Sequence, residues 1–214
     1  IIINFNKSFS NINAETFIKK VLVGRLKSKY IFVSRNFRFG KKREGNINTL
    51  KKYEKNCFYK TIVTTPYQKK KKLISSTLIR KNIAEGKVDN VRELLGRPWS
   101  IEGVVVKGQK RGRKIGFPTC NINWNSYALP RLGVYSVKVE SKNFKNKGIA
   151  NIGYRPTFNG KTLLLEINIF GIKTNLYKKI LKVSFIKFIR PEKKFKNISK
   201  LKNQIKKDII SAKK

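Results

Sequence analysis

Helical spacing of apolar residues dominates the first half of the chain. Within residues 14–26 the apolar positions include Phe17, Ile18, Val21 and Leu22, and Asn13 precedes them as a cap. The same reasoning predicts three further helices, over residues 48–55, 74–86 and 89–95. Ser75 or Ser76 begins the second of these, and Gly86 and Gly96 end the last two. With a short strand over residues 30–33, this half is predicted to be α/β.

After Pro98 the pattern changes to strands separated by glycine, proline and asparagine. Strands are predicted over residues 101–106, 134–139, 149–152, 163–170 and 181–188. In GVYSVKVE, Tyr135, Val137 and Val139 point one way, while the residues between them point the other way. This spacing favours a closed antiparallel β-barrel. Residues 198–212 then place Ile198, Leu201, Ile205 and Ile209 on one helical stripe, which is predicted to cover the barrel.

The segment RGRKIGFPTCN, residues 111–121, carries the first candidate chemistry. Gly112 and Gly116 allow backbone N–H groups to approach anionic oxygens, and the cations between them supply charge. The hydroxyl of Thr119 and the amide oxygen of Asn121 are ligands that suit Mg²⁺. This combination points to nucleotide phosphoryl transfer, although an ordinary basic surface turn fits the same residues.

A second candidate is Glu166, because carboxylates rarely occupy apolar strands such as TLLLEINIF. In an extended strand Glu166 and Asn168 share one face, and Leu165 and Ile167 share the other. The polar face is able to line a site. The alternative is a glutamate that is solvated or paired with one of the many lysines.

Residues 98–208 resemble the riboflavin kinase domain of the bacterial bifunctional riboflavin kinase/FAD synthetases. The matching motifs are GRPWSIEGVVVKGQKRGRKIGFPTCNI, LPRLGVYSVKV, IANIGYRPTF, LEINIF followed by NLYKK, and FIRPEKKF. The resemblance implies a kinase barrel over residues 97–214 that transfers the γ-phosphoryl group of ATP to riboflavin and gives FMN. Cys120 stands where the family usually has alanine, and Asn168, Gly171, Asn175 and Lys178 also depart from its pattern.

The resemblance also assigns roles to single residues. Glu166 matches the catalytic base, and Thr119 and Asn121 match the ligands of Mg²⁺ (or Mn²⁺). The residues that match the ATP site are Lys107, Gly108, Arg111, Gly112, Arg113, Gly116, Pro118, Asn168 and Tyr177. Arg190, Glu192 and Phe195 match the flavin site. For Tyr177 and Phe195, simple packing of an aromatic ring is an equally good explanation.

Upstream, FNKSFSNINAETFIKKVL, IFVSRNFRFGKKREGN and ISSTLIR resemble the second half of the adenylyltransferase domain of the same proteins. We therefore expect residues 1–96 to be an incomplete Rossmann-like nucleotidyltransferase domain, and the fold class to be α+β overall. Ser75, Ser76, Thr77 and Arg80 match its phosphate-contacting motif. The chain has no histidine, so the HxGH motif of that domain is missing. Adenylyl transfer is expected of full-length members rather than of this fragment.

The charge of +40 raises an alternative function, a basic β-barrel that binds RNA or another polyanion. Against it, 39 of the 51 cations are lysines scattered along both halves, without the clustered arginines and aromatics of nucleic-acid grooves. Two cysteines, the lack of a signal pattern and the lack of a long apolar stretch predict a soluble cytoplasmic protein without a membrane partner. The expected partners are small-molecule substrates and no specific nucleic acid; the sequence predicts no oligomeric state.

Overall fold

The computed structural model describes residues 2–65, 68–69, 72–123, 127–157, 160–172 and 174–213. The chain forms two compact units, Ile1–Ile74 and Ser75–Lys214. The family-domain boundary after residue 96 stays a prediction. The second unit takes in the two helices before Pro98, because Ile83, Val88 and Val91 are buried in the same core as the barrel residues Trp99 and Phe185.

The first unit is a small α/β arrangement. Its elements are α1 Lys7–Ser10, α2 Ala14–Thr16, η1 Phe17–Arg25, β1 Tyr30–Ser34, η2 Lys41–Arg43, α3 Ile47–Cys57, β2 Lys60–Thr64, β3 Gln68–Lys69 and β4 Lys72–Leu73. The predicted helix over 14–26 is confirmed: Asn13 caps α2 by accepting a hydrogen bond from the Thr16 N–H at 2.7 Å, and η1 continues it with π geometry. The β1–β2 pair is parallel, and β2 was not predicted.

The second unit begins with two short helices, α4 Ser76–Ala84 and α5 Val88–Leu95, as predicted. Ser75 caps α4 by accepting from the Leu78 N–H at 3.2 Å. Gly86 and Gly96 follow the helices with φ of 77° and 70°, a left-handed conformation that glycine adopts without strain.

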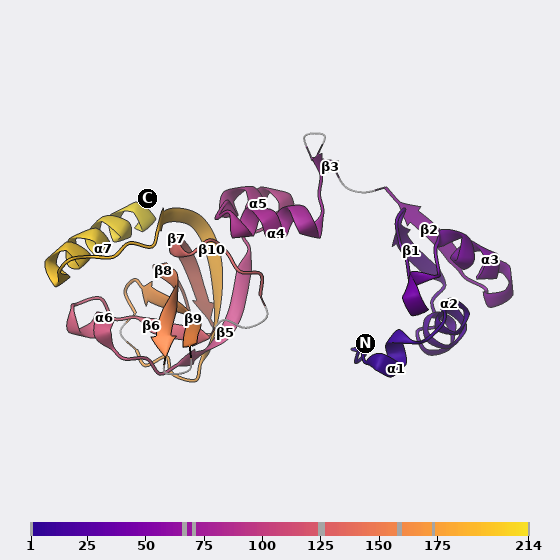
Figure 1. Ribbon diagram of the computed structural model, residues 1–214, viewed down its shortest axis with the longest axis horizontal. Helices are drawn as coiled ribbons and strands as arrows, with labels where there is room; N and C mark the ends of the chain where they lie inside the picture. Colours follow the sequence, from indigo (N-terminus) through magenta and orange to yellow (C-terminus); the bar gives the residue numbers. More distant parts are fainter. Residues whose placement is uncertain are drawn as a thin grey trace. The chain divides into compact units, whose positions relative to one another are not determined.

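A closed antiparallel barrel follows (Figure 1), and it confirms the predicted fold. Its strands are β5 Ser100–Val106, β6 Cys120–Asn123, β7 Gly133–Ser141, β8 Phe144–Thr157, β9 Gly160–Ile169 and β10 Ile180–Pro191. The order around the barrel is β10-β5-β6-β9-β8-β7. The alternation in β7 is as predicted, because Tyr135, Val137 and Val139 are fully buried inside the barrel.

Residues 111–121 contain two elements that the sequence analysis did not predict. The structure contains a short helix, α6 Arg111–Lys114, and strand β6 begins at Cys120. The run Cys120–Asn123 is too short and polar to predict as a strand. It forms a strand because it pairs with β5 on one side and with β9 on the other.

The last helix, α7 Ile198–Lys213, lies beside the barrel (Figure 1), where it packs against β7, β8 and β10. Ile205, Ile209 and Ala212 pack against Val134 and Ile149 on the outer face of the strands. The predicted stripe is wrong at its start, since Ile198 is 61% exposed. Ile198 and Leu201 both line a cavity, and the α7 residues that pack against the strands begin at Ile205.

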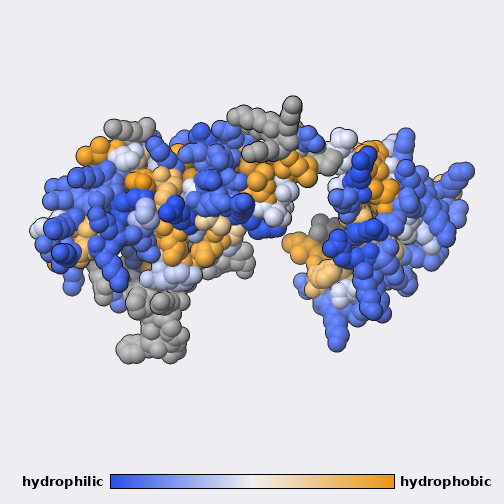
Figure 2. Space-filling view, turned by 45° about the horizontal axis from the view of Figure 1, so that its top comes forward, coloured by the Kyte–Doolittle hydropathy of each residue, from blue (hydrophilic) through white to orange (hydrophobic). Residues whose placement is uncertain are grey.

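On the face shown in Figure 2, hydrophilic side chains predominate over both units. This agrees with a chain in which cations outnumber acids by 51 to 11. Within the part of the chain that the structure describes, no helix has both the length and the apolar character needed to cross a membrane.

Candidate active site

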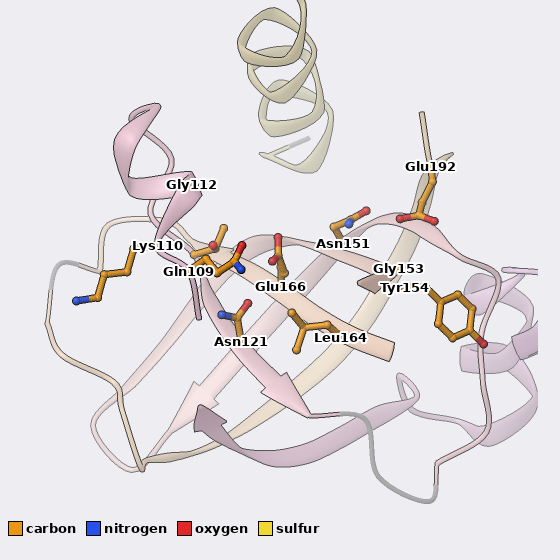
Figure 3. A pocket seen from close by; sticks show the side chains of 11 residues that line it. Gln109, Lys110, Gly112, Asn121, Asn151, Gly153, Tyr154, Leu164, Glu166 and Glu192 are labelled. Carbon is orange, nitrogen blue, oxygen red and sulfur yellow. The ribbon is translucent and has the colours of Figure 1, made fainter. Parts of the chain in front are cut away.

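A row of three polar side chains crosses the outer face of the barrel. Glu166 in the middle strand β9 is the direct register partner of Asn121 on β6 and of Asn151 on β8. Directly opposed residues in antiparallel strands have Cβ atoms about 5 Å apart, so the three side chains are neighbours. Figure 3 shows Glu166 between Asn121 and Asn151 on the same face. The alternation of β9 explains this placement, because Leu165 and Ile167 fill the barrel interior.

Asn121 is buried and closely packed. The residue is 6% exposed, and within the described residues its Oδ1 has no hydrogen-bond partner. Gly108 lies directly against it, since any Cβ at residue 108 would collide with the Asn121 amide. A buried amide oxygen that lacks a partner is costly unless a ligand or water completes it. Asn121 Oδ1 is therefore an acceptor that is suited to a cation.

Thr119 lies beside the row at the end of the loop that follows α6. A Cβ at Gly112 would be 3.1 Å from Thr119 Oγ1 and would collide with the Phe117 carbonyl, so only glycine fits there. The loop is also attached to β9, because Asn168 Nδ2 donates to the Pro118 carbonyl at 2.7 Å. These contacts place a hydroxyl oxygen and an amide oxygen together near Glu166.

Three cavities meet at this point, and Thr119 lines all of them. The first, of about 280 Å³, contains Asn121, Asn151 and Glu166 (Figure 3). The second, of about 620 Å³, is lined by Lys110, Arg113, Pro118, Cys120 and Tyr177, among others. The third, of about 580 Å³, lies between the α6 loop and α7 and includes Phe117, Glu166, Arg190, Glu192 and Phe195. Glu166 thus lines both the first and the third cavity.

The residues predicted for the flavin site lie together in the third cavity. The Arg190 guanidinium lies 5.8 Å from the centre of the Phe195 ring. Glu192 packs so closely on β8 that a Cβ at Gly153 would collide with its carboxylate. Phe195 is partly exposed and lines the cavity, whereas Tyr177 both packs against the barrel core and lines the second cavity.

Some predicted residues lie outside these cavities. Among the described residues, Lys107, Gly108 and Gly116 line none of the three, although Gly108 lies against Asn121, and Gly116 has φ of 90° and ends the α6 turn. The side chain of Arg111 lies outside the described part of the structure. The residues of the adenylyltransferase motif, Ser75, Ser76, Thr77 and Arg80, lie at the start of α4 and line none of these three cavities either.

Sequence reasoning missed Asn151, Gly153 and Asp208. Asn151 stands in the apolar run IANIG with the same polar-in-strand signal that identified Glu166. Asp208 is the one acidic residue in a lysine-rich last helix, which was a usable signal. The need for glycine at residue 153 was not visible, because it depends on a contact with Glu192 that is distant in sequence.

Cys120 lies on the face of β6 opposite to Asn121, next to the register partner Ile167. Burial raises the pKa of its thiol to about 11, because the charged thiolate loses its hydration inside the protein. The thiol is therefore neutral at physiological pH.

Comparison with known protein families identifies the barrel as a riboflavin kinase domain. Residues 95–214 match the riboflavin kinase family, and residues 1–78 match the FAD synthetase family. The kinase match covers all six barrel strands and the covering helix α7.

Curated relatives extend the likeness over the whole chain. A bifunctional riboflavin kinase/FMN adenylyltransferase of Buchnera aphidicola subsp. Schizaphis graminum is 44% identical over 99% of this chain and 69% of its own length. The corresponding protein of Haemophilus influenzae is 38% identical over 100% of this chain and 70% of its own length. The crystal structure of a macrolide-efflux protein from Streptococcus pneumoniae superposes with a TM-score of 0.84, at 32% identity over 98% of this chain and 68% of its own. The chain belongs to the bifunctional riboflavin kinase/FMN adenylyltransferase family.

Proposed function

We propose that this chain transfers the γ-phosphoryl group of ATP to the 5′-hydroxyl of riboflavin and gives FMN. The observation that carries this proposal is the register of the barrel, in which Glu166 lies between Asn121 and Asn151 where the three cavities meet. Family membership supports the same function and disfavours the alternative of a polyanion-binding barrel.

Glu166 is proposed as the general base. A primary hydroxyl is a poor nucleophile at neutral pH, so a carboxylate that accepts its proton during the attack speeds the reaction. Glu166 lines both the third cavity, which suits a ring, and the first, which contains Asn121 and Thr119. A hydroxyl that extends from the third cavity toward the first would reach this carboxylate.

Thr119 and Asn121 are proposed to hold Mg²⁺ or Mn²⁺. The residues fit such an ion, since hydroxyl and amide oxygens are hard ligands and Asn121 Oδ1 is buried without a partner among the described residues. When bound, the ion would offset the negative charge of the phosphate oxygens. Gly108 lies against Asn121, and Gly112 lies against Thr119. Because glycine has no side chain, both positions leave space for the two proposed ligand side chains.

ATP is proposed to occupy the second cavity, with its phosphates toward Thr119. Lys110 and Arg113 line this cavity and provide positive charge for the phosphates, while Cys120, Ile167 and Tyr177 provide apolar surface. The flavin is proposed to occupy the third cavity, which includes the aromatic ring of Phe195 and the apolar side chains of Ile115, Phe117 and Leu201. The two substrates would then meet at Thr119, which lines both cavities.

Adenylyl transfer is not proposed for this chain. Its 214 residues contain no histidine, and only residues 1–78 match the FAD synthetase family. We further propose that the partners are these small molecules and that the protein acts in the cytoplasm.

The test is chromatographic separation of riboflavin, FMN and FAD after incubation of the purified chain with riboflavin and MgATP. We expect FMN to form and to depend on Glu166. The control is Glu140→Gln, which removes another strand carboxylate, one that forms an ion pair with the surface residue Lys145 at 2.9 Å. If Glu166→Gln makes FMN as fast as Glu140→Gln does, Glu166 is not the base. If the unaltered chain makes no FMN, the proposed function is wrong.

A further inference from the structure

Helix α7 contains a buried carboxylate, Asp208, that has no role in the proposed reaction. Asp208 is 2% exposed, and it accepts hydrogen bonds from both Nε and Nη2 of Arg190. The distances are 3.0 Å from Nε to Oδ1, 3.1 Å from Nε to Oδ2 and 2.8 Å from Nη2 to Oδ2. Gln204, one turn earlier, donates from Nε2 to Asp208 Oδ1 at 2.9 Å. The carboxylate is thus fully engaged.

This pair differs from the other ion pairs of the described residues. The side chains of Arg190 and Asp208 are 19% and 3% exposed, whereas the pairs Lys19–Glu15, Lys87–Glu85 and Lys145–Glu140 each involve side chains that are 32% exposed or more. Charged groups are rarely buried unless they are paired, and an arginine that binds a carboxylate through two nitrogens is fixed in orientation as well as position. Asp208 therefore determines where the Arg190 guanidinium lies.

The guanidinium is part of the wall of the third cavity. It lies 5.8 Å from the Phe195 ring centre, and its Nη1 donates to the Pro191 carbonyl at 3.0 Å. Arg190, Phe195 and Asp208 all line the cavity that also contains Glu166. The orientation imposed by Asp208 is thereby transmitted to the surface that a ring in this cavity would contact.

The charges around the cavity point to a second effect of Asp208. The chain has 11 acids against 51 cations, yet the third cavity is lined by the acids Glu166, Glu192 and Asp208 and the cations Lys114, Arg190 and Lys193. The local balance is neutral. Without Asp208, Arg190 would present an uncompensated positive charge in a partly apolar cavity, and such a site attracts anions.

We infer that Asp208, supported by Gln204, is a positioning residue that holds and neutralises Arg190, so that the third cavity presents a flat and charge-balanced wall to the flavin ring. This inference rests on the proposed kinase function. It adds a specificity role for α7, because the neutral cavity favours an uncharged ring over the phosphates that the neighbouring cavity binds.

The test compares Asp208→Asn with the unaltered chain in steady-state FMN formation. We expect the KM for riboflavin to rise about tenfold, because the charge-assisted contact that orients Arg190 is lost, while the KM for ATP and kcat change less than about twofold. At saturating MgATP, inorganic phosphate should become competitive with riboflavin in Asp208→Asn and not in the unaltered chain. A purely structural role would lower the amount of active enzyme without this selective change.

Matched variants on the same helix keep the inference falsifiable. Gln204→Ala should raise the riboflavin KM less than Asp208→Asn, and Asn203→Ala, an exposed neighbour, should leave it unchanged. Arg190→Lys keeps the charge but loses the two-nitrogen contact, so it should reproduce the KM effect even where Asp208→Asn fails to fold. If the unaltered chain is active, and both Arg190→Lys and Asp208→Asn keep its riboflavin KM, the role of Asp208 is wrong while the proposed function stands. A chain that makes no FMN overturns the proposed function instead.

Discussion

The two units of this chain differ in how completely their strands are paired. In the barrel every strand has a partner on each side, and its interior contains fully buried residues such as Leu165, Ile167 and Phe185. In the first unit β1 and β2 form a two-stranded parallel sheet, on which Tyr30 and Phe32 are 62% and 65% exposed. Parallel sheets are normally covered on both faces, and two-stranded sheets are marginal by themselves.

The candidate active site lies in the unit whose strands are all paired. All the residues of the candidate active site are on strands of the closed barrel or on the loops and the helices α6 and α7 attached to it. A catalytic constellation needs side chains held to within about 0.5 Å, and a barrel without free edges provides that better than an open pair of strands.

The largest expected effect separates the barrel site from the rest of the chain. Glu166→Gln should lower kcat for FMN formation by about 10²- to 10⁴-fold, the usual contribution of a general base. The thermal midpoint of the barrel should change little, because glutamine keeps the size of the side chain. Single-turnover rates measured beside the Glu140→Gln control would check this. A loss of less than about threefold would contradict the proposed base.

The next effect tests the core of the barrel. Leu165→Ala should lower the free energy of unfolding of the second unit by about 2–5 kcal/mol, because it leaves a cavity among fully buried neighbours. Denaturant unfolding followed by tryptophan fluorescence would measure it, since Trp99 belongs to the same core. An unchanged midpoint would mean that the barrel interior is not packed as described.

A smaller effect concerns the thiol of Cys120 on strand β6. Because burial raises the pKa of Cys120 to about 11, its reactive thiolate is scarce at pH 8, and its alkylation should accelerate as the pH rises toward that value. Iodoacetamide labelling of a Cys57→Ser variant, followed by mass spectrometry, isolates Cys120. MgATP should slow the labelling further, because Cys120 lines the second cavity. Rapid labelling at pH 7 would contradict the buried environment.

The smallest effect is expected in the first unit. Phe32→Ser should change the free energy of unfolding by no more than about 0.5 kcal/mol, since a side chain that is 65% exposed loses few contacts on replacement. Hydrogen exchange would be measured for β1 and β2 and for β7 and β8, in the unaltered chain and in Phe32→Ser. It would show whether the first unit opens more readily than the barrel. A loss comparable to that of Leu165→Ala would show that the exposed face of β1 is covered in solution.

The sequence predicted the parts of the fold that depend on local pattern. Alternation in GVYSVKVE and LEINIF identified the barrel strands and their inner faces, and serine and glycine positions identified the ends of α4 and α5. Strand β6 was missed because its four residues gain strand structure only from β5 and β9 on either side. The helical stripe of α7 was wrong at Ile198, because periodicity indicates a face and not where the neighbouring strands end.

By itself the amino-acid sequence determined the strand-rich second half, the carboxylate in an apolar strand and the glycine-containing basic segment, because period and residue type are local properties. Only the tertiary structure decided that Asn121 and Asn151 flank Glu166, that Gly153 must leave room for Glu192, and that Asp208 pairs with Arg190. These are contacts between residues far apart in the chain. They depend on the register in which the barrel closes and on the place where α7 packs, and no local pattern specifies either.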